Sequence, residues 1–311
     1  MKYNSIIIVG PTACGKTGLS IDLAKSLNAE IVGADSLQIY KDYNIGTAKI
    51  TEEEKSGIKH HMIDFLDPNA TYSVSEYKKD AMQALEDIMK RNVVPIIVGG
   101  TGFYIDALIG NNLYGECPAN ADIREKYNNI ATKQGKEYLY SILLEKDPET
   151  AKKLHYNDIK RVVRALEILE CTGKTKSELE LINRAQQNTS ILKPLIIGLN
   201  LSTRDKLYAK INKRVDIMFD LGLEKEINNL LSKGVKTDAQ GFQAIGYKEF
   251  IPYLEGNITL EQLKDLIKIN TRHYAKRQLT YFKKLNINKW YNTDIMTNEE
   301  IIKDVLSTFN C

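Results

Sequence analysis

The chain has 311 residues, of which 43% are hydrophobic and 27% charged, and its formal net charge is +3. These values are ordinary for a globular protein with one large or two medium domains, and they exclude disordered and fibrous proteins. The apolar run near the N-terminus is too short for a signal peptide, and no window approaches about 18 uninterrupted apolar residues. We therefore expect a cytoplasmic protein without a membrane partner.

The strongest pattern lies close to the N-terminus, where residues 10–17 match G-x-x-x-x-G-K-[ST] at every fixed position. The apolar run Ser5–Val9 before it predicts a buried strand, and Thr17–Leu27 after it has the apolar spacing of a helix. Such a loop wraps backbone N–H groups around an anion, Lys16 adds a full charge, and the Thr17 hydroxyl can bind magnesium. The residues predicted to bind a di- or triphosphate are Gly10, Pro11, Thr12, Ala13, Cys14, Gly15, Lys16 and Thr17.

An acidic residue follows the next predicted strand. Glu30–Ala34 is apolar enough to form a second buried strand, and Asp35 stands at its carboxyl end. Ligands of parallel α/β sheets collect at this edge. From the pattern alone, Asp35 could bind magnesium, act as a general base beside the phosphate site, or cap the next helix through Ser36.

Strands and helices continue to alternate along the chain. A helix is predicted at 75–89, and a second glycine-rich turn, Gly99–Tyr104, follows a third strand. The third, fourth and fifth strands are predicted at 93–98, 192–201 and 288–291. The alternation predicts an α/β fold, a P-loop-type parallel sheet flanked by helices.

The stretch between the third and fourth strands has helical patterns and no convincing strand, and it is too long for a simple crossover. We therefore predict a helical insertion domain at 115–193. The P-loop core with its C-terminal helices is then formed by 1–114 and 194–311. Within it, residues 203–282 are expected to be helical, with loops at 234–241 and 252–257.

The cysteines and histidines do not have the spacing of a metal site. The four cysteines are far apart, with no C-x-x-C pattern, and we expect reduced thiols: Cys14, Cys117, Cys171 and Cys311. His60 and His61 are adjacent, project differently and have no third ligand nearby. A structural or loop role is predicted for them.

Positive charge is concentrated near the C-terminus. Between Lys264 and Lys289 there are eight basic residues and one acid, so this stretch carries +7 and the remainder −4. Tyr274, Tyr281 and Phe282 are interleaved with these charges. A basic helix face is often only solvated, but this excess combined with aromatic residues favours RNA binding.

Eight motifs in this order resemble those of the bacterial tRNA dimethylallyltransferases (tRNA isopentenyltransferases), from residue 10 to about 282. The motifs are GPTAxGKT at 10–17, DSxQxY at 35–40, GTAK at 46–49, HxxDxxDP at 61–68, GGTGxY at 99–104, NDxxRxxRALE at 157–167, AIGYKE at 244–249 and RxYAKRQ at 272–278. The departures are Cys14, where the family has a small residue or serine, and Tyr281, where an indole is common.

The resemblance implies that the phosphate loop binds the diphosphate of dimethylallyl diphosphate and not ATP. The family transfers the dimethylallyl group to the exocyclic amine of the adenosine 3′-adjacent to the tRNA anticodon and releases diphosphate with Mg²⁺. In this chain, the resemblance makes Asp35 the general base. Lys16, magnesium on Thr17 and Arg214 would neutralise the leaving diphosphate, and Thr101 would orient the amine and the bridging oxygen. Without the resemblance, Arg214 could be a solvated helix charge and Thr101 a helix N-cap.

The expected partners are dimethylallyl diphosphate and the anticodon stem-loop of tRNA, with no obligate protein partner inferred. The adenosine would leave its stack to reach the allylic carbon. The residues predicted to contact tRNA are Asp35, Ser36, Leu37, Gln38, Thr101, Arg161, Arg164, Lys276 and Arg277. We expect the diphosphate to lie at a distance from the basic stretch.

Two other classes of function remain open from sequence. A P-loop small-molecule kinase or an adenylate dimethylallyltransferase would share residues 10–17 but would need no RNA surface. An RNA-binding module with a regulatory nucleotide site would leave Asp35, Thr101 and Arg214 without a catalytic role.

Overall fold

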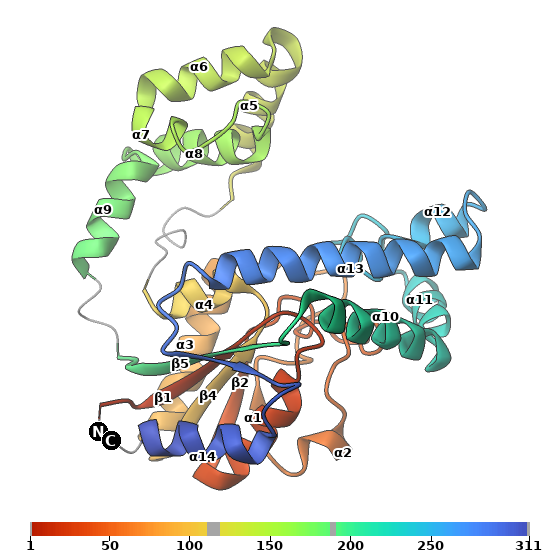
Figure 1. The fold of residues 1–311 in the computed structure, drawn as a ribbon. Helices are drawn as coiled ribbons and strands as arrows, with labels where there is room; N and C mark the ends of the chain where they lie inside the picture. The colour runs from red at the N-terminus through yellow and green to blue at the C-terminus, as the bar shows by residue number, and fades with distance from the viewer. Residues whose placement is uncertain (1, 111–118, 187–190, 310–311) are drawn as a thin grey trace. The chain divides into compact units, whose positions relative to one another are not determined.

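The structure is a computed structural model that describes residues 2–110, 119–186 and 191–309 (Figure 1). The chain forms two compact units. The core unit comprises Met1–Ser73, Lys79–Ile105 and Leu192–Cys311, and the second unit comprises Val74–Lys78 and Asp106–Ile191. Two of the predicted thiols, Cys117 and Cys311, lie outside the described residues, whereas Cys14 and Cys171 are free cysteines.

A six-stranded, entirely parallel sheet forms the centre of the core unit, with the strand order β3-β2-β4-β1-β5-β6. The strands are β1 (Ser5–Val9), β2 (Ala29–Gly33), β3 (His60–His61), β4 (Val94–Gly99), β5 (Pro194–Asn200) and β6 (Lys289–Asn292). This confirms the predicted α/β fold class. The strand β3 was not predicted; it pairs with Ile31 and Val32 of β2, so the two histidines are edge-strand residues.

Both faces of the sheet are buried. Ile6 and Ile8 belong to an apolar cluster that includes residues of α1 (Lys16–Leu27) and α14 (Asn298–Phe309). Figure 1 shows these two helices side by side below the sheet. Ile7 and Val9 point to the opposite face, because side chains alternate along a strand, and they are also fully buried.

The order of the strands explains why helices cover both faces. The connection from β1 to β2 and the one from β3 to β4 run in opposite directions across the sheet. Because parallel crossovers are right-handed, α1 and α3 (Val74–Lys90) lie on opposite faces. In α3, Ala81, Leu85 and Ile88 are fully buried at helical spacing.

The other helices that reach into the core unit are α2 (Glu52–Lys55), α4 (Gly102–Leu108), α10 (Arg204–Asp220), α11 (Leu223–Ser232), α12 (Phe250–Leu254) and α13 (Leu260–Phe282). The loop predicted at 252–257 was partly wrong, because α12 extends into it: Pro252 stands in the first turn, where its missing N–H costs no hydrogen bond. A capping box of Thr259 and Gln262 starts α13.

Among its described residues, the second unit consists of helices joined by turns and loops. It contains α5 (Ala121–Gln134), α6 (Lys136–Lys146), α7 (Pro148–Ala151), α8 (Ile159–Thr172) and α9 (Lys176–Gln186). Tyr127, Leu143 and Leu166 are part of its own apolar cluster. We propose that the insertion domain expected at 115–193 corresponds to this unit. Within the described residues, no helix has the length and apolar character that a bilayer crossing requires.

Candidate active site

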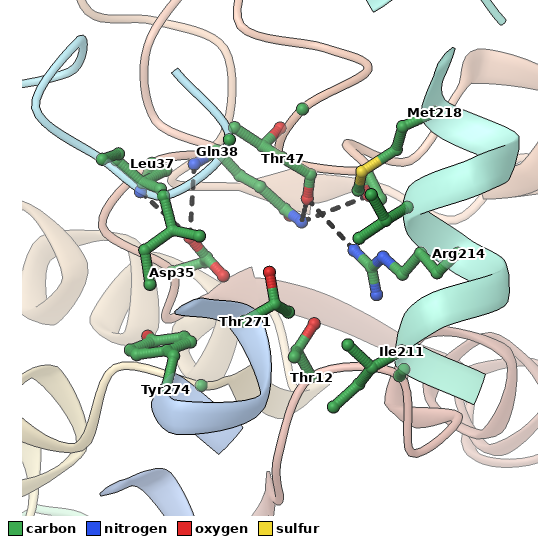
Figure 2. Close-up of a pocket in the computed structure, with 18 of the residues that line it drawn as sticks. Thr12, Asp35, Leu37, Gln38, Thr47, Ile211, Arg214, Met218, Thr271 and Tyr274 are labelled. Atoms are coloured by element: carbon green, nitrogen blue, oxygen red, sulfur yellow. Dashed lines mark hydrogen bonds between the residues drawn. The ribbon is translucent and has the colours of Figure 1, made fainter. Parts of the chain in front are cut away.

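A cavity of about 720 Å³ lies in the core unit, at the carboxyl ends of β1, β2 and β4 (Figure 2). Its lining brings together segments that are far apart in the sequence. They are residues 12–17 of the phosphate loop, 35–38 after β2, 46–48, Gly100, residues within 240–246, and residues of α10 and α13. Most of the site residues predicted from the sequence thus surround one volume.

The phosphate loop is shaped by its glycines and by a lysine. Gly15 caps α1 with φ of 93°, a left-handed conformation that favours glycine. A Cβ on Gly10 would lie 2.4 Å from the Leu199 carbonyl oxygen. Lys16 Nζ donates to the carbonyls of Gly10 (2.9 Å) and Pro11 (2.7 Å), which orders the loop around the ammonium group. Thr17 also lines the cavity.

Two half-buried cations, Lys16 and Arg214, line this cavity. Burial lowers the pKa of Lys16, and the positive charge of Arg214 lowers it further. Burial also lowers the pKa of Arg214, and the carboxylate of Asp35 opposes this shift. Arg214 Nη2 donates to the carbonyl of Thr47 at 3.4 Å, and its buried Nε has no hydrogen-bond partner among the described residues. An anion in the cavity would stabilise both cations.

Asp35 begins a turn and also lines the cavity. Its Oδ1 accepts hydrogen bonds from the N–H groups of Leu37 (2.9 Å) and Gln38 (3.4 Å). In the part of the chain that is described, Oδ2 has no such partner, and Figure 2 shows the side chain beside the cavity. The predicted capping role and a role as a base are therefore compatible, since each uses a different oxygen.

Thr101 connects the ends of two strands. Its hydroxyl oxygen accepts from the Ser36 N–H at 3.0 Å, and its own N–H donates to the Ala34 carbonyl at 3.1 Å. Tyr274 of α13 lies near Thr101 and Asp35, and burial is the largest cause that raises the pKa of its phenol. The phenol therefore stays neutral beside the carboxylate.

One residue of the cavity that the sequence did not single out is Gln278. This buried side chain accepts from the N–H of Thr12 at 2.9 Å and donates to the carbonyl of Gly100, also at 2.9 Å. It ties the phosphate loop to the second glycine turn. A Cβ at position 100 would lie 2.2 Å from the Gln278 amide nitrogen, which explains a glycine there. In the sequence, the only indication of a role for Gln278 was its place in the RxYAKRQ motif.

We expect Gln278→Leu to weaken diphosphate binding by about tenfold, because each buried group left unpaired costs about 1–3 kcal/mol and the loop loses its anchor. Calorimetric titration with inorganic diphosphate and Mg²⁺ measures the affinity. Thr280→Ala is the control, because among the described residues the Thr280 hydroxyl bonds only to a carbonyl of its own helix, that of Lys276. Equal affinities of the two variants would contradict this role.

The basic stretch divides into paired and unpaired side chains. Lys264, Lys268 and Lys289 form ion pairs with Glu261 (3.3 Å), Asp216 (2.6 Å) and Asp304 (2.7 Å). Among the described residues, four basic side chains at the C-terminal end of α13 and just beyond it have no such pair: Lys276, Arg277, Lys283 and Lys284. These four residues are called the basic patch below.

The expected distance between the diphosphate site and the basic stretch was wrong. Arg277 lines the same cavity as the phosphate loop, with its guanidinium 5.8 Å from the ring centre of Tyr274. The reason is that α13 crosses the edge of the sheet where the strands end, so that Gln278 can reach Thr12. Arg277 therefore lies at the mouth of the site and belongs to the basic patch.

The other two predicted tRNA contacts, Arg161 and Arg164, are on α8 of the second unit. Arg161 forms an exposed ion pair with Asp158 at 3.2 Å. Arg164 forms an ion pair with the fully buried Glu167 at 2.7 Å, so part of its role is internal to this unit.

His61, one of the two adjacent histidines, lies in the core unit, with its Nε2 atom 2.7 Å from the Glu30 carboxylate.

Comparison with known proteins identifies the family of the chain. The family model described as IPP transferase matches residues 38–285. The chain belongs to the IPP transferase family. It is 46% identical to a "tRNA dimethylallyltransferase" of Caldanaerobacter subterraneus subsp. tengcongensis, over 98% of this chain and 97% of the relative.

Solved structures of the family have the same fold. One is the tRNA delta(2)-isopentenylpyrophosphate transferase of Staphylococcus epidermidis, with 42% identity, a TM-score of 0.71 and 98% of each chain covered. Another is a eukaryotic dimethylallyltransferase acting on tRNA, with 30% identity and a TM-score of 0.80. This second match covers 98% of the present chain and 79% of the other.

Proposed function

We propose that this protein transfers the dimethylallyl group from dimethylallyl diphosphate to the exocyclic amine of the adenosine 3′-adjacent to the tRNA anticodon, releasing diphosphate. The observation that carries the proposal is one cavity that holds a carboxylate, Asp35, and two half-buried cations, Lys16 and Arg214. Family membership supplies the reaction class.

The residues can be assigned to the parts of this reaction. The bond between the allylic carbon and the diphosphate oxygen breaks, and its electron pair leaves with the diphosphate beside Lys16 and Arg214. The amine nitrogen bonds to the allylic carbon and loses a proton, which the carboxylate of Asp35 accepts. Thr101, bonded to the turn after Asp35, orients the amine. In this assignment, the two cations neutralise the charge of the leaving diphosphate, and Asp35 takes up the proton of the amine.

Magnesium suits the oxygen donors of the cavity. The Thr17 hydroxyl and the Asp35 carboxylate both line it. Magnesium binds oxygen and usually keeps several ligands from water and substrate phosphates. Thr17 would hold the ion against the diphosphate, and the ion would reduce the negative charge on the leaving group.

The acceptor RNA would approach over the basic patch, with Asp35, Ser36, Leu37, Gln38 and Thr101 beside the flipped adenosine. Lys276 and Arg277 are exposed, and Arg277 also lines the cavity, so one helix connects the surface to the site. Arg161 and Arg164 remain proposed contacts from the second unit. Phosphate contacts would hold the anticodon stem-loop, and the adenosine would leave its stack.

Incubation with radiolabelled dimethylallyl diphosphate tests the function. Label is expected to enter tRNA when tRNA and AMP are offered separately. Label in AMP alone would instead identify an adenylate dimethylallyltransferase, and label in neither would favour an RNA-binding module. A small-molecule kinase would transfer phosphate from ATP to an acceptor. The same protein preparation can be tested for this phosphate transfer.

Replacing Lys276 and Arg277 together with alanine is expected to weaken tRNA binding most at low salt. Each phosphate contact contributes about 0.7–0.9 to the slope of log affinity against log salt, so the slope should flatten by roughly one to two units. Affinity measured at several salt concentrations gives the slope. The matched control is Lys264→Ala with Lys268→Ala on the same helix, since both lysines are ion-paired. Parallel lines for the test variant and the unchanged protein would mean that the two side chains touch no phosphate.

A further inference from the structure

The carboxylate of Glu226, which lies outside the cavity, binds the backbone of a segment that lines it. The two oxygens of Glu226 on α11 accept four hydrogen bonds. Oε2 accepts from the N–H groups of Asn44 (3.0 Å) and Ile45 (2.6 Å). Oε1 accepts from the N–H of Gly46 (3.1 Å) and from the hydroxyl of Tyr247 (2.7 Å). Three successive backbone N–H groups therefore converge on one side chain.

The inner side of the same segment faces the cavity. The carbonyls of Thr47 and Ala48 accept from Gln38 Nε2 at 3.2 and 3.3 Å, and the Thr47 carbonyl accepts from Arg214 Nη2 (Figure 2). The N–H of Ala48 donates to the Ile45 carbonyl, so the segment is a single closed turn. A displacement of its outer N–H groups would therefore also displace its inner carbonyls.

The segment has little room to take another shape. A Cβ on Gly46 would lie 2.6 Å from the ring of Tyr247. Tyr247 is fully buried and packs on Tyr43, with 4.7 Å between ring centres. Backbone, ring and carboxylate thus fit together in one arrangement. Glu226 itself is not among the residues that line the cavity.

We propose that Glu226 is a positioning residue that sets the direction of Arg214 and Gln38 through the segment Asn44–Ala48. Through Arg214 it acts on the diphosphate, and through Gln38 on the acceptor base. The inference rests on the proposed function for these two ligands. The placement of Arg214 by a carboxylate outside the cavity can be tested by anion binding alone, without any transfer reaction.

Glu226→Gln tests this, because the amide keeps the size of the side chain but replaces one accepting oxygen with a donor. Glu224→Gln is the matched control on the same helix. It changes the charge equally, and in the described part of the chain Glu224 accepts a hydrogen bond only from the hydroxyl of Tyr253, at 3.2 Å. We expect Glu226→Gln to weaken binding of inorganic diphosphate with Mg²⁺ about tenfold. The single-turnover rate of label transfer should fall about 10- to 100-fold, because a misplacement of about 1 Å can cost 10²-fold. Glu224→Gln should stay within about twofold.

A mutant cycle distinguishes positioning from a loss of stability. If Glu226 acts through Arg214, the effect of Glu226→Gln on diphosphate affinity should largely disappear in the Arg214→Ala background. Full additivity, or an unchanged affinity of a folded Glu226→Gln variant, would overturn the proposal even if its melting temperature falls.

Two further measurements keep the proposal testable. If Glu226→Gln does not fold, Tyr247→Phe removes one donor to the carboxylate and should weaken diphosphate binding about threefold; no change would overturn the proposal. If the unchanged protein does not label tRNA, the proposed function fails. The diphosphate affinities of the variants still decide the role of Glu226.

Discussion

Asp35→Asn is expected to bind diphosphate and tRNA as the unchanged protein does and to lose turnover by about 10²- to 10⁴-fold, the usual effect of removing a general base. The amide oxygen can still accept from the N–H of Leu37, so the turn after β2 keeps its shape. What the variant lacks is a basic oxygen facing the cavity. The single-turnover rate at saturating concentrations of both substrates measures the effect.

Asp67→Asn is the matched control for this variant. Asp67 Oδ1 accepts from the N–H of Asn69 at 2.8 Å, so it caps a turn as Asp35 does, but it does not line the cavity. Its replacement should leave the single-turnover rate unchanged. A nearly normal rate for Asp35→Asn would limit Asp35 to the capping role and assign the proton to another acceptor.

The parts of the site that were predictable are those whose residues are neighbours in the sequence. The strand, loop and helix around Lys16 follow one another directly, and Asp35 stands two positions after the end of β2. Local patterns fix such segments, and the rule that ligands collect at the carboxyl ends of parallel strands places them together. Thr101 follows β4 in the same way.

The parts that could not be predicted depend on contacts between distant residues. Gln278 and Thr12 are separated by 266 positions, and no local pattern shows that they meet. Arg277 was placed away from the phosphate loop for the same reason. The strand β3 has two residues and exists through its pairing with β2. Glu226 lies outside all eight motifs, and only the folded chain shows what its carboxylate binds.

Lys16→Ala and Arg214→Ala are each expected to weaken diphosphate binding and to slow the chemical step, whereas tRNA affinity should not change. Loss of one preorganised charge contact costs of the order of 3 kcal/mol, or roughly a hundredfold in rate. The structure adds a reason. Burial lowers the pKa of both groups, and the positive charge of Arg214 lowers that of Lys16 further. A bound diphosphate therefore gains most where the two charges are poorly solvated.

The measurements are calorimetric titration with inorganic diphosphate, the single-turnover rate, and tRNA affinity at one fixed salt concentration. Arg204→Ala is the control for Arg214→Ala, since Arg204 is exposed at the start of the same helix and does not line the cavity. It removes an equal charge without touching the site, so all three quantities should stay normal. If Lys16→Ala or Arg214→Ala instead reduces tRNA affinity and leaves diphosphate affinity intact, these cations face the RNA, and the leaving group must be neutralised by other groups of the cavity.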